Sequence, residues 1–194
     1  IKTVTITAGS FLASQGDFAF AGSANYVLGV TERGSLAKYG VGLWNTHRLF
    51  LLVAPRGQDE QTFAAFEFYR TDGYGPNRAA QRASGVGSYA RTHKKLRLRW
   101  RLSFFGYAAR YDQPGPVRQD DYVTGQMGFW DTYDSNQGGE SNRFLSTFHL
   151  RVGPRRSRFQ QVAWFGFRTM RNRSNWTGWM LDDLTDGEVF VATE

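Results

Sequence analysis

Arginines at every second position of one short segment give the strongest chemical signal in this chain. In Leu96–Phe105, Arg97, Arg99 and Arg101 alternate with large apolar residues. A period of two is typical of a β-strand, in which successive side chains point to opposite faces. We therefore expect one face to carry a row of guanidinium groups, which attract anions. The opposite face carries Leu96, Leu98, Trp100, Leu102 and Phe104.

The two faces of this segment need different surroundings. The wet face of a strand in a soluble sandwich rarely carries three arginines in register, and its buried face is usually aliphatic. In an outer-membrane barrel, by contrast, apolar residues face lipid and charged residues face an aqueous lumen. The pattern therefore predicts that Arg97, Arg99 and Arg101 face a lumen and attract anions, and that the five apolar residues face lipid. The alternative for the arginines is a solvated strand face without a chosen ligand.

Other residues with catalytic or metal-binding chemistry are scattered. His47, His93 and His149 lie in separate segments, and none has the H-E-x-x-H spacing of a helical zinc site. The acidic clusters of the sequence, such as Asp120–Asp121 and Asp182, Asp183, Asp186 and Glu188, lack the twelve-residue spacing of a calcium loop. We expect no catalytic site, no metal site and no cofactor, so the chain is not predicted to be an enzyme.

The basic charge of the chain also raises nucleic acid as a partner. The formal net charge is +7 and the sequence pI is about 9.9. Around Trp100, however, the indole points to the face opposite Arg99 and Arg101, so one surface cannot both stack a base and neutralise its phosphate. We therefore expect no nucleic-acid partner. Late arginines such as Arg151 extend the basic tally, and those in turns suit anionic lipid headgroups.

Short strands separated by turn residues must position these side chains. The 194 residues suffice for one domain or for a barrel of roughly 8–12 strands, and the longest apolar run, Leu49–Ala54, is too short for a membrane-spanning helix. Without cysteine, the chain has no disulfides. The expected strands are Lys2–Ala8, Asp17–Thr31, Ser35–Trp44, His47–Ala54, Thr62–Arg70, Gly85–Arg91, Leu96–Tyr111, Tyr122–Tyr133, Phe144–Arg151, Gln160–Met170 and Val189–Ala192.

The connections between these strands are of unequal length. A tight turn is expected at Thr46, whereas Asp72–Arg82 and Gln113–Asp121 are long and polar. Short turns at one end and long loops at the other are typical of outer-membrane barrels. Aromatic clusters such as Trp164–Phe167 suit the aromatic girdles of such barrels, although they also fit a soluble core or a carbohydrate-binding face.

Three segments, in order, resemble TonB-dependent outer-membrane receptors, which hold a plug domain inside a β-barrel. Ile1–Tyr26, reading IKTVTITAGSFLASQGDFAFAGSANY, resembles the end of the plug leading into the first barrel strand. Gly40–Asn77, with GLWNTHR and YRTDGYGPN, resembles the following hairpin and loop start. Gly106–Tyr122, GYAARYDQPGPVRQDDY, resembles a strand that ends in an extracellular loop.

The resemblance implies uptake of a scarce nutrient such as an iron chelate, driven through TonB. Compared with the 22-stranded barrel of that family, this chain lacks about half the strands, most of the plug and the segment that contacts TonB. We expect either a piece of a receptor or a shortened barrel, in which the first and last strands, Ile1–Ala8 and Val189–Ala192, would pair.

The sequence therefore predicts an all-β, antiparallel, up-and-down barrel of the bacterial outer membrane. Residues 1–194 would form a single barrel domain, of which 1–21 resemble the end of a plug. The expected role is a passive barrel or narrow pore with a cationic lumen, in contact with outer-membrane lipid and open to a small ligand or ion. The alternative is a soluble basic β-sandwich or barrel that binds a polyanion or a glycan.

Overall fold

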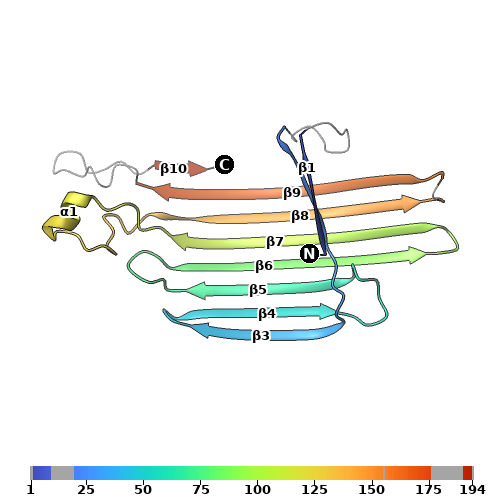
Figure 1. Cartoon of the computed structure of the whole chain (residues 1–194), viewed down its shortest axis with the longest axis horizontal. Helices are drawn as coiled ribbons and strands as arrows, with labels where there is room; N and C mark the ends of the chain where they lie inside the picture. Colours follow the sequence, from blue (N-terminus) through green and yellow to red (C-terminus); the bar gives the residue numbers. More distant parts are fainter. Residues whose placement is uncertain (1, 10–19, 155, 176–189, 194) are drawn as a thin grey trace.

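The fold is built from antiparallel strands in two sheets (Figure 1). The computed structural model describes residues 2–9, 20–154, 156–175 and 190–193. A two-stranded sheet contains β1 and β2, and an eight-stranded sheet has the order β10-β9-β8-β7-β6-β5-β4-β3. The elements are β1 Thr3–Ala8, β2 Gly22–Val27, β3 Gly34–Gly42, β4 Thr46–Ala54, β5 Phe63–Thr71, β6 Ala80–His93, β7 Leu98–Asp112, α1 Gln119–Thr124, β8 Gly138–Val152, β9 Phe159–Ser174 and β10 Phe190–Thr193.

Every pairing in the large sheet joins strands that follow one another in the chain. The all-β, antiparallel, up-and-down fold expected from the sequence is therefore confirmed. Closure into a barrel is not observed: among the described strands, β3 and β10 form two separate edges of an open sheet. The expected pairing of the first and last strands was wrong, because β1 pairs with β2 and β10 pairs with β9.

Two further expectations about individual segments were wrong. The segment Tyr122–Tyr133 is not a strand; it contains the end of the short helix α1 and a loop, and α1 stops where Gly125 takes a left-handed conformation with φ of 77°. The expected strand Asp17–Thr31 is reduced to β2, and its residues 17–19 lie outside the described part of the chain.

The connections show the expected asymmetry only in part, because 55–62 has as many residues as 72–79 although the two lie at opposite ends of the sheet. Connections 72–79 and 113–137 lie at the same end of the sheet, and 55–62, 94–97 and 153–158 lie at the other (Figure 1). The three-residue turn 43–45 also lies at the end with the long loops. There Trp44 and Asn45 both have φ of 53°, as a type I′ hairpin turn requires.

The register divides the side chains of the large sheet into two faces. Residues directly opposite one another point the same way, so Trp100, Leu150 and Gln161 share one face, and Arg101, His149 and Val162 share the other. We call the first the apolar face and the second the charged face. Exposed large apolar side chains on the apolar face of β3–β9 are Tyr39, Val41, Leu51, Val53, Phe66, Tyr89, Phe104, Phe144, Phe148, Phe159, Phe165 and Phe167; those on the charged face are Leu36, Val162, Trp164 and Met170.

Charged residues of the apolar face lie only near the ends of strands β3–β9. At the loop end, one row across the sheet runs through His47, Arg70, Gln81, Arg110, Glu140 and Arg171. At the other end, Arg91 lies opposite Trp100. Between these rows the apolar face of β3–β9 has no charged side chain. The two rows are ten residues apart along β7, which is about 33 Å along a strand that rises about 3.3 Å per residue.

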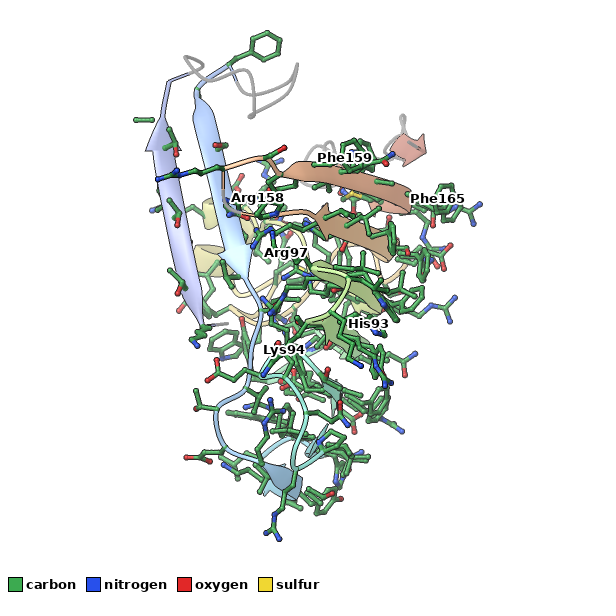
Figure 2. The ribbon with its side chains drawn as sticks, turned by 90° about the vertical axis from the view of Figure 1, so that its right-hand side faces the viewer. His93, Lys94, Arg97, Arg158, Phe159 and Phe165 are labelled. Carbon is green, nitrogen blue, oxygen red and sulfur yellow. The ribbon has the colours of Figure 1, made fainter. Side chains whose placement is uncertain are left out.

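The β1–β2 hairpin lies across the charged face (Figures 1 and 2). In Figure 2, Phe165 points away from the hairpin, as expected for the apolar face. The hairpin is held at its base, where the Val30 amide donates to the Glu60 carbonyl at 2.9 Å and Lys2 forms an ion pair with the Glu60 carboxylate. Few apolar side chains are buried: among the described residues they are Ala54, Phe63 and Ala90.

Candidate functional site: a cationic pocket between hairpin and sheet

The charged face of β7 and β8 carries a compact group of basic side chains. Arg99 lies directly opposite Arg151, and Arg101 lies directly opposite His149. The four side chains occupy two adjacent rows at the end of the sheet away from the long loops. We call Arg99, Arg101, His149 and Arg151 the basic cluster.

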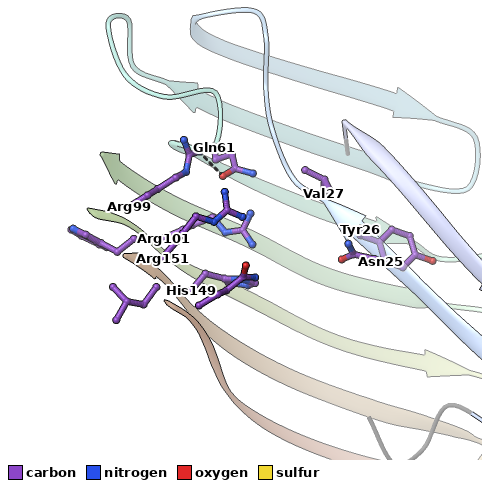
Figure 3. A pocket seen from close by; sticks show the side chains of 11 residues that line it. Asn25, Tyr26, Val27, Gln61, Arg99, Arg101, His149 and Arg151 are labelled. Atoms are coloured by element: carbon purple, nitrogen blue, oxygen red, sulfur yellow. Dashed lines mark hydrogen bonds between the residues drawn. The ribbon is translucent and has the colours of Figure 1, made fainter. Parts of the chain in front are cut away.

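The hairpin forms the opposite wall of a pocket above this cluster (Figure 3). The pocket has a volume of about 350 Å³. Asn25, Tyr26 and Val27 of β2 line it from the hairpin side, and the basic cluster faces them from the sheet. Gln61 and Gln160 add amide groups to the lining. The pocket is therefore polar, and it lies between two sheets rather than on one surface.

The arginines of the basic cluster outnumber the carboxylates that pair with them. Arg99 forms an ion pair with Asp59 at 2.9 Å and donates to the Gln61 side-chain oxygen at 3.0 Å. The Arg101 Nε is buried and makes no hydrogen bond within the described structure. Neither Arg101 nor Arg151 forms an ion pair with a described carboxylate. Three arginines and one nearby carboxylate leave an excess of two positive charges, an arrangement able to bind an anion.

The structure separates the arginines that the sequence grouped. Arg99 and Arg101 lie on the charged face as expected, and Leu98, Trp100, Leu102 and Phe104 lie on the apolar face. The expected start of the strand at Leu96 was wrong, because Leu96 and Arg97 lie in the turn before β7. Arg97 has φ of 48°, and its carbonyl accepts from the Gly153 amide at 3.0 Å. It therefore belongs to the turn and does not line the pocket.

Sequence reasoning missed two members of the basic cluster. His149 was interpreted as an isolated histidine and Arg151 as part of a general basic tally. The segment Phe148–Val152 carries the same alternation as β7, with Phe148 and Leu150 on one face and His149 and Arg151 on the other. This signal predicts the face but not the partner, because the register with β7 is a tertiary property.

A second group of charges lies on the same face nearer the loop end. Glu67 forms ion pairs with Arg48 of the preceding strand and, at 3.1 Å, with Arg82 of the following strand. The Arg82 guanidinium also lies 5.1 Å from the Tyr69 ring centroid. These two arginines share one carboxylate, so the contacts connect three strands. The group therefore has an excess of one positive charge, compared with two in the basic cluster.

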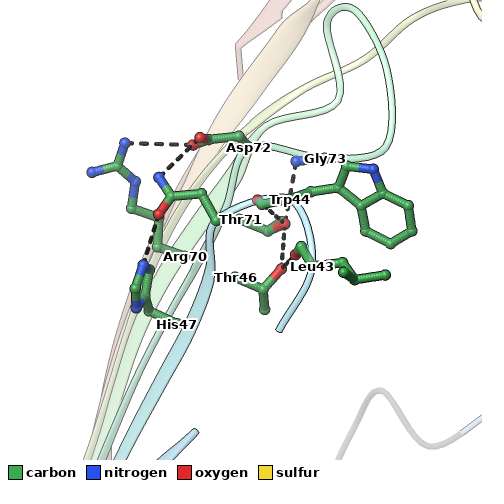
Figure 4. A network of polar contacts seen from close by, with 9 residues as sticks. Leu43, Trp44, Thr46, His47, Arg70, Thr71, Asp72 and Gly73 are labelled. Atoms are coloured by element: carbon green, nitrogen blue, oxygen red, sulfur yellow. Dashed lines mark hydrogen bonds and ion pairs between the residues drawn. The ribbon is translucent and has the colours of Figure 1, made fainter. Parts of the chain in front are cut away.

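Polar contacts at the loop end connect the first hairpin to the next loop (Figure 4). Asn45 donates to the Asp72 carboxylate at 2.9 Å, and Arg70 contacts the same carboxylate at 3.4 Å. The Thr46 hydroxyl lies 2.8 Å from the Thr71 hydroxyl. These contacts fix turn 43–45 against the start of loop 72–79.

Asn77 fixes that loop to the long loop beyond β7. Its side-chain nitrogen donates to the carbonyls of Gln113 at 2.6 Å, Gln137 at 3.0 Å and Asp134 at 3.4 Å. Asn77 has φ of 53°, a left-handed conformation that asparagine tolerates better than most residues. The next residue, Arg78, lies 5.2 Å from the Tyr74 ring centroid and 5.4 Å from the Trp130 ring centroid.

Loop 113–137 also has its own ionic contacts. Arg118 donates to Asp120 at 2.9 Å, and this hydrogen bond lowers the pKa of the Asp120 carboxyl and raises the pKa of Arg118. Burial raises the pKa of the Tyr133 phenol, and its hydrogen bond to the Asp121 carboxylate raises it further. These contacts order the loop above the sheet.

The described part of the chain shows no group of three or more histidine, cysteine or acidic residues able to hold a metal ion. Among the helices of the described residues, none is long and apolar enough to cross a membrane. Comparisons of the chain with family models, with curated proteins and with solved structures find no match.

Proposed function

We propose that the chain forms the wall of a bacterial outer-membrane β-barrel related to TonB-dependent uptake receptors. The apolar face would contact lipid, and the charged face, with the β1–β2 hairpin across it, would line an aqueous lumen. In this form the chain acts as a passive barrel wall or narrow pore with a cationic inner surface, and it performs no catalysis.

The charge-free band of the apolar face is the observation that carries this proposal. At the strand tilt of about 40° that outer-membrane barrels have, its length of about 33 Å along β7 would give a height of about 25 Å, which is the height of the apolar band of such barrels. The band ends in charged residues at both limits, Arg110 at the loop end and Arg91 at the other. The opposite face of the same strands carries Arg48, Glu67, Arg99 and Arg101, so the two faces suit two different solvents.

The alternative, a soluble basic sandwich that binds a polyanion or a glycan, is less well supported. A sandwich buries the apolar faces of its sheets against each other. Here Phe165 is 64% exposed and Phe167 is 57% exposed, and the hairpin lies on the other face. Of the exposed large apolar side chains of β3–β9, twelve lie on the apolar face and four on the charged face, and a continuous apolar face of this kind suits lipid better than water.

A cysteine scan along β7 tests which face contacts lipid. The chain has no cysteine, so each single substitution from Leu98 to Ala108 gives one unique label position. In bilayers, nitroxides on the apolar face, such as at Phe104, should be most accessible to oxygen. Nitroxides on the charged face, such as at Phe105, should be most accessible to a water-soluble nickel complex. A scan without a period of two, or with the two reagents exchanged, would contradict the proposal.

Conductance across a planar bilayer tests the lumen. Discrete anion-selective steps are expected from a closed cationic pore, and a folded barrel without conductance would indicate a filled lumen. Heat-modifiable gel mobility is the control for folding. A chain that fails to fold in detergent but folds cooperatively in plain buffer would support the soluble alternative.

A further inference from the structure

We propose that the pocket between the β1–β2 hairpin and the sheet binds a small oxyanion, either a phosphate or a carboxylate, that couples the hairpin to the wall. The proposal assigns a ligand class to the charged face. That the pocket lies within a lumen rests on the proposed function, but anion binding itself depends only on the geometry of the pocket.

The register of β7 and β8 places like charges directly opposite each other. Arg99 faces Arg151 across the two strands, and cross-strand neighbours of this kind have Cβ atoms about 5 Å apart. Like charges at that position destabilise a sheet unless another charge compensates them. Asp59 pairs with Arg99 alone, so a bound anion between Arg101 and Arg151 would supply the compensation that the described residues do not.

The hydrogen-bond donors of the pocket suit an oxyanion. Arg101 lines the pocket and forms no ion pair with a described carboxylate, and guanidinium groups bind carboxylate and phosphate through paired N–H donors. The amides of Asn25, Gln61 and Gln160 offer neutral donors on both sides of the pocket. A nucleic-acid ligand is not favoured, because Trp100, the indole of this segment, is on the opposite face of its strand.

Because the pocket lies between the hairpin and the sheet, an anion bound in it can contact both. One side-chain donor, the Asn25 amide, comes from β2, whereas the arginines come from the sheet. An anion that contacts both sides would hold the hairpin against the charged face, beyond the contacts of Lys2 and Val30 at the base of the hairpin. The volume of about 350 Å³ exceeds that of one oxyanion and leaves room for a small organic group.

Binding is measured on the full chain folded in detergent. Inorganic phosphate and succinate are titrated separately by calorimetry, with chloride at matched ionic strength to control for screening. Saturable binding with one site per chain is expected for at least one of the two, and their relative affinity identifies the preferred oxyanion. Absence of saturable binding for both would overturn the proposal.

Matched variants locate the site. Arg101→Gln and Arg151→Gln should each weaken binding by about tenfold or more, because each removes a charge-assisted donor. Arg91→Gln removes the same charge from the same level of the sheet but on the apolar face, so it should leave binding unchanged. Equal weakening by all three variants would show a nonspecific charge effect and refute the site.

A nitroxide at Thr5 on β1 reports the coupling of the hairpin. Phosphate or succinate should reduce its mobility in the parent chain but not in Arg101→Gln. Binding without this change would refute the coupling. The cysteine scan along β7 separates this proposal from the proposed function. If the scan shows the period of two but no anion binds, the anion site is refuted and the membrane assignment stands. If an anion binds but the scan lacks that period, the membrane assignment is refuted and the anion site stands.

Discussion

Replacing Phe165 with arginine should destabilise the protein far more than the same replacement at its neighbour Trp164. The two aromatics are adjacent in β9, 64% and 74% exposed, and on opposite faces. Phe165 lies on the apolar face in the row of Phe104, which is six residues from Arg110 and four from Trp100 along β7. This places Phe165 near the middle of the charge-free band.

The expected magnitude follows from that depth. Arginine on the lipid face of a barrel near the bilayer midplane costs about 2–4 kcal/mol, whereas lumen-facing positions accept charge. Phe165→Arg should therefore lower the folding equilibrium constant in bilayers by about 30- to 700-fold. Trp164→Arg places the charge on the face that already carries arginines, so a change within about 0.5 kcal/mol is expected.

Equilibrium urea unfolding in phosphocholine vesicles measures both variants, with heat-modifiable gel mobility as a second probe. If the chain were soluble, both residues would be ordinary exposed positions, and both substitutions would be nearly neutral in buffer. Equal free energies of unfolding for the two variants in bilayers would therefore refute the assignment of the faces.

Three further predictions concern the loops and the charged face. Asn77→Asp keeps the shape and the left-handed tolerance of the residue but replaces a donor to three carbonyls with an acceptor; a loss of about 1–3 kcal/mol in local stability is expected, seen as faster amide exchange in 113–137 and unchanged exchange in β8. If exchange in that loop does not change, Asn77 does not hold it. Glu67→Gln leaves Arg48 and Arg82 without their carboxylate and should cost about 1 kcal/mol in unfolding experiments, with an increase in anion selectivity if the chain conducts; an increase in cation selectivity would contradict the charged lumen. Tyr133 should titrate above the ordinary tyrosine pKa, so its contribution to stability is complete below that ordinary pKa and is lost as pH rises through the raised value; ultraviolet absorbance of the parent chain minus that of Tyr133→Phe measures it, and a midpoint at the ordinary value would contradict the contact with Asp121.

The sequence predicted the strands well where alternation was strong and turn residues were clear. In β7, the alternation around Trp100 gave both the strand and the sorting of its faces. The error at Arg97 arose because Leu96 and Arg97 continue the alternating pattern of β7 but belong to the turn 94–97. A pattern of residue types does not reveal that Arg97 has a positive φ. The segment Tyr122–Tyr133 was expected to be a strand, but its aromatic rings contact one another within a helix end and a loop: the Phe129 ring centroid lies 4.7 Å from that of Trp130 and 6.0 Å from that of Tyr122.

The candidate site was only half predictable for a related reason. Arg99 and Arg101 followed from local periodicity, whereas Arg151 joined them through the β7–β8 register and Asn25 through the placement of the hairpin on the charged face. Register and sheet packing depend on contacts between distant segments, so local pattern cannot give them. The pocket therefore required the structure.

The strict neighbour-to-neighbour pairing of the large sheet has a consequence for the order of its assembly. Each new strand can add to the edge left by the previous one. Among the connections between described strands of this sheet, the three-residue turn 43–45 has the smallest loop-closure entropy cost, so we expect the β3–β4 hairpin to form first. The connection 113–137 has 25 residues, about three doublings longer, which adds about 2 kcal/mol of loop-closure entropy before β8 can reach β7. We therefore expect β3–β7 to form as one cooperative unit, to which β8 and β9 add in a later kinetic step.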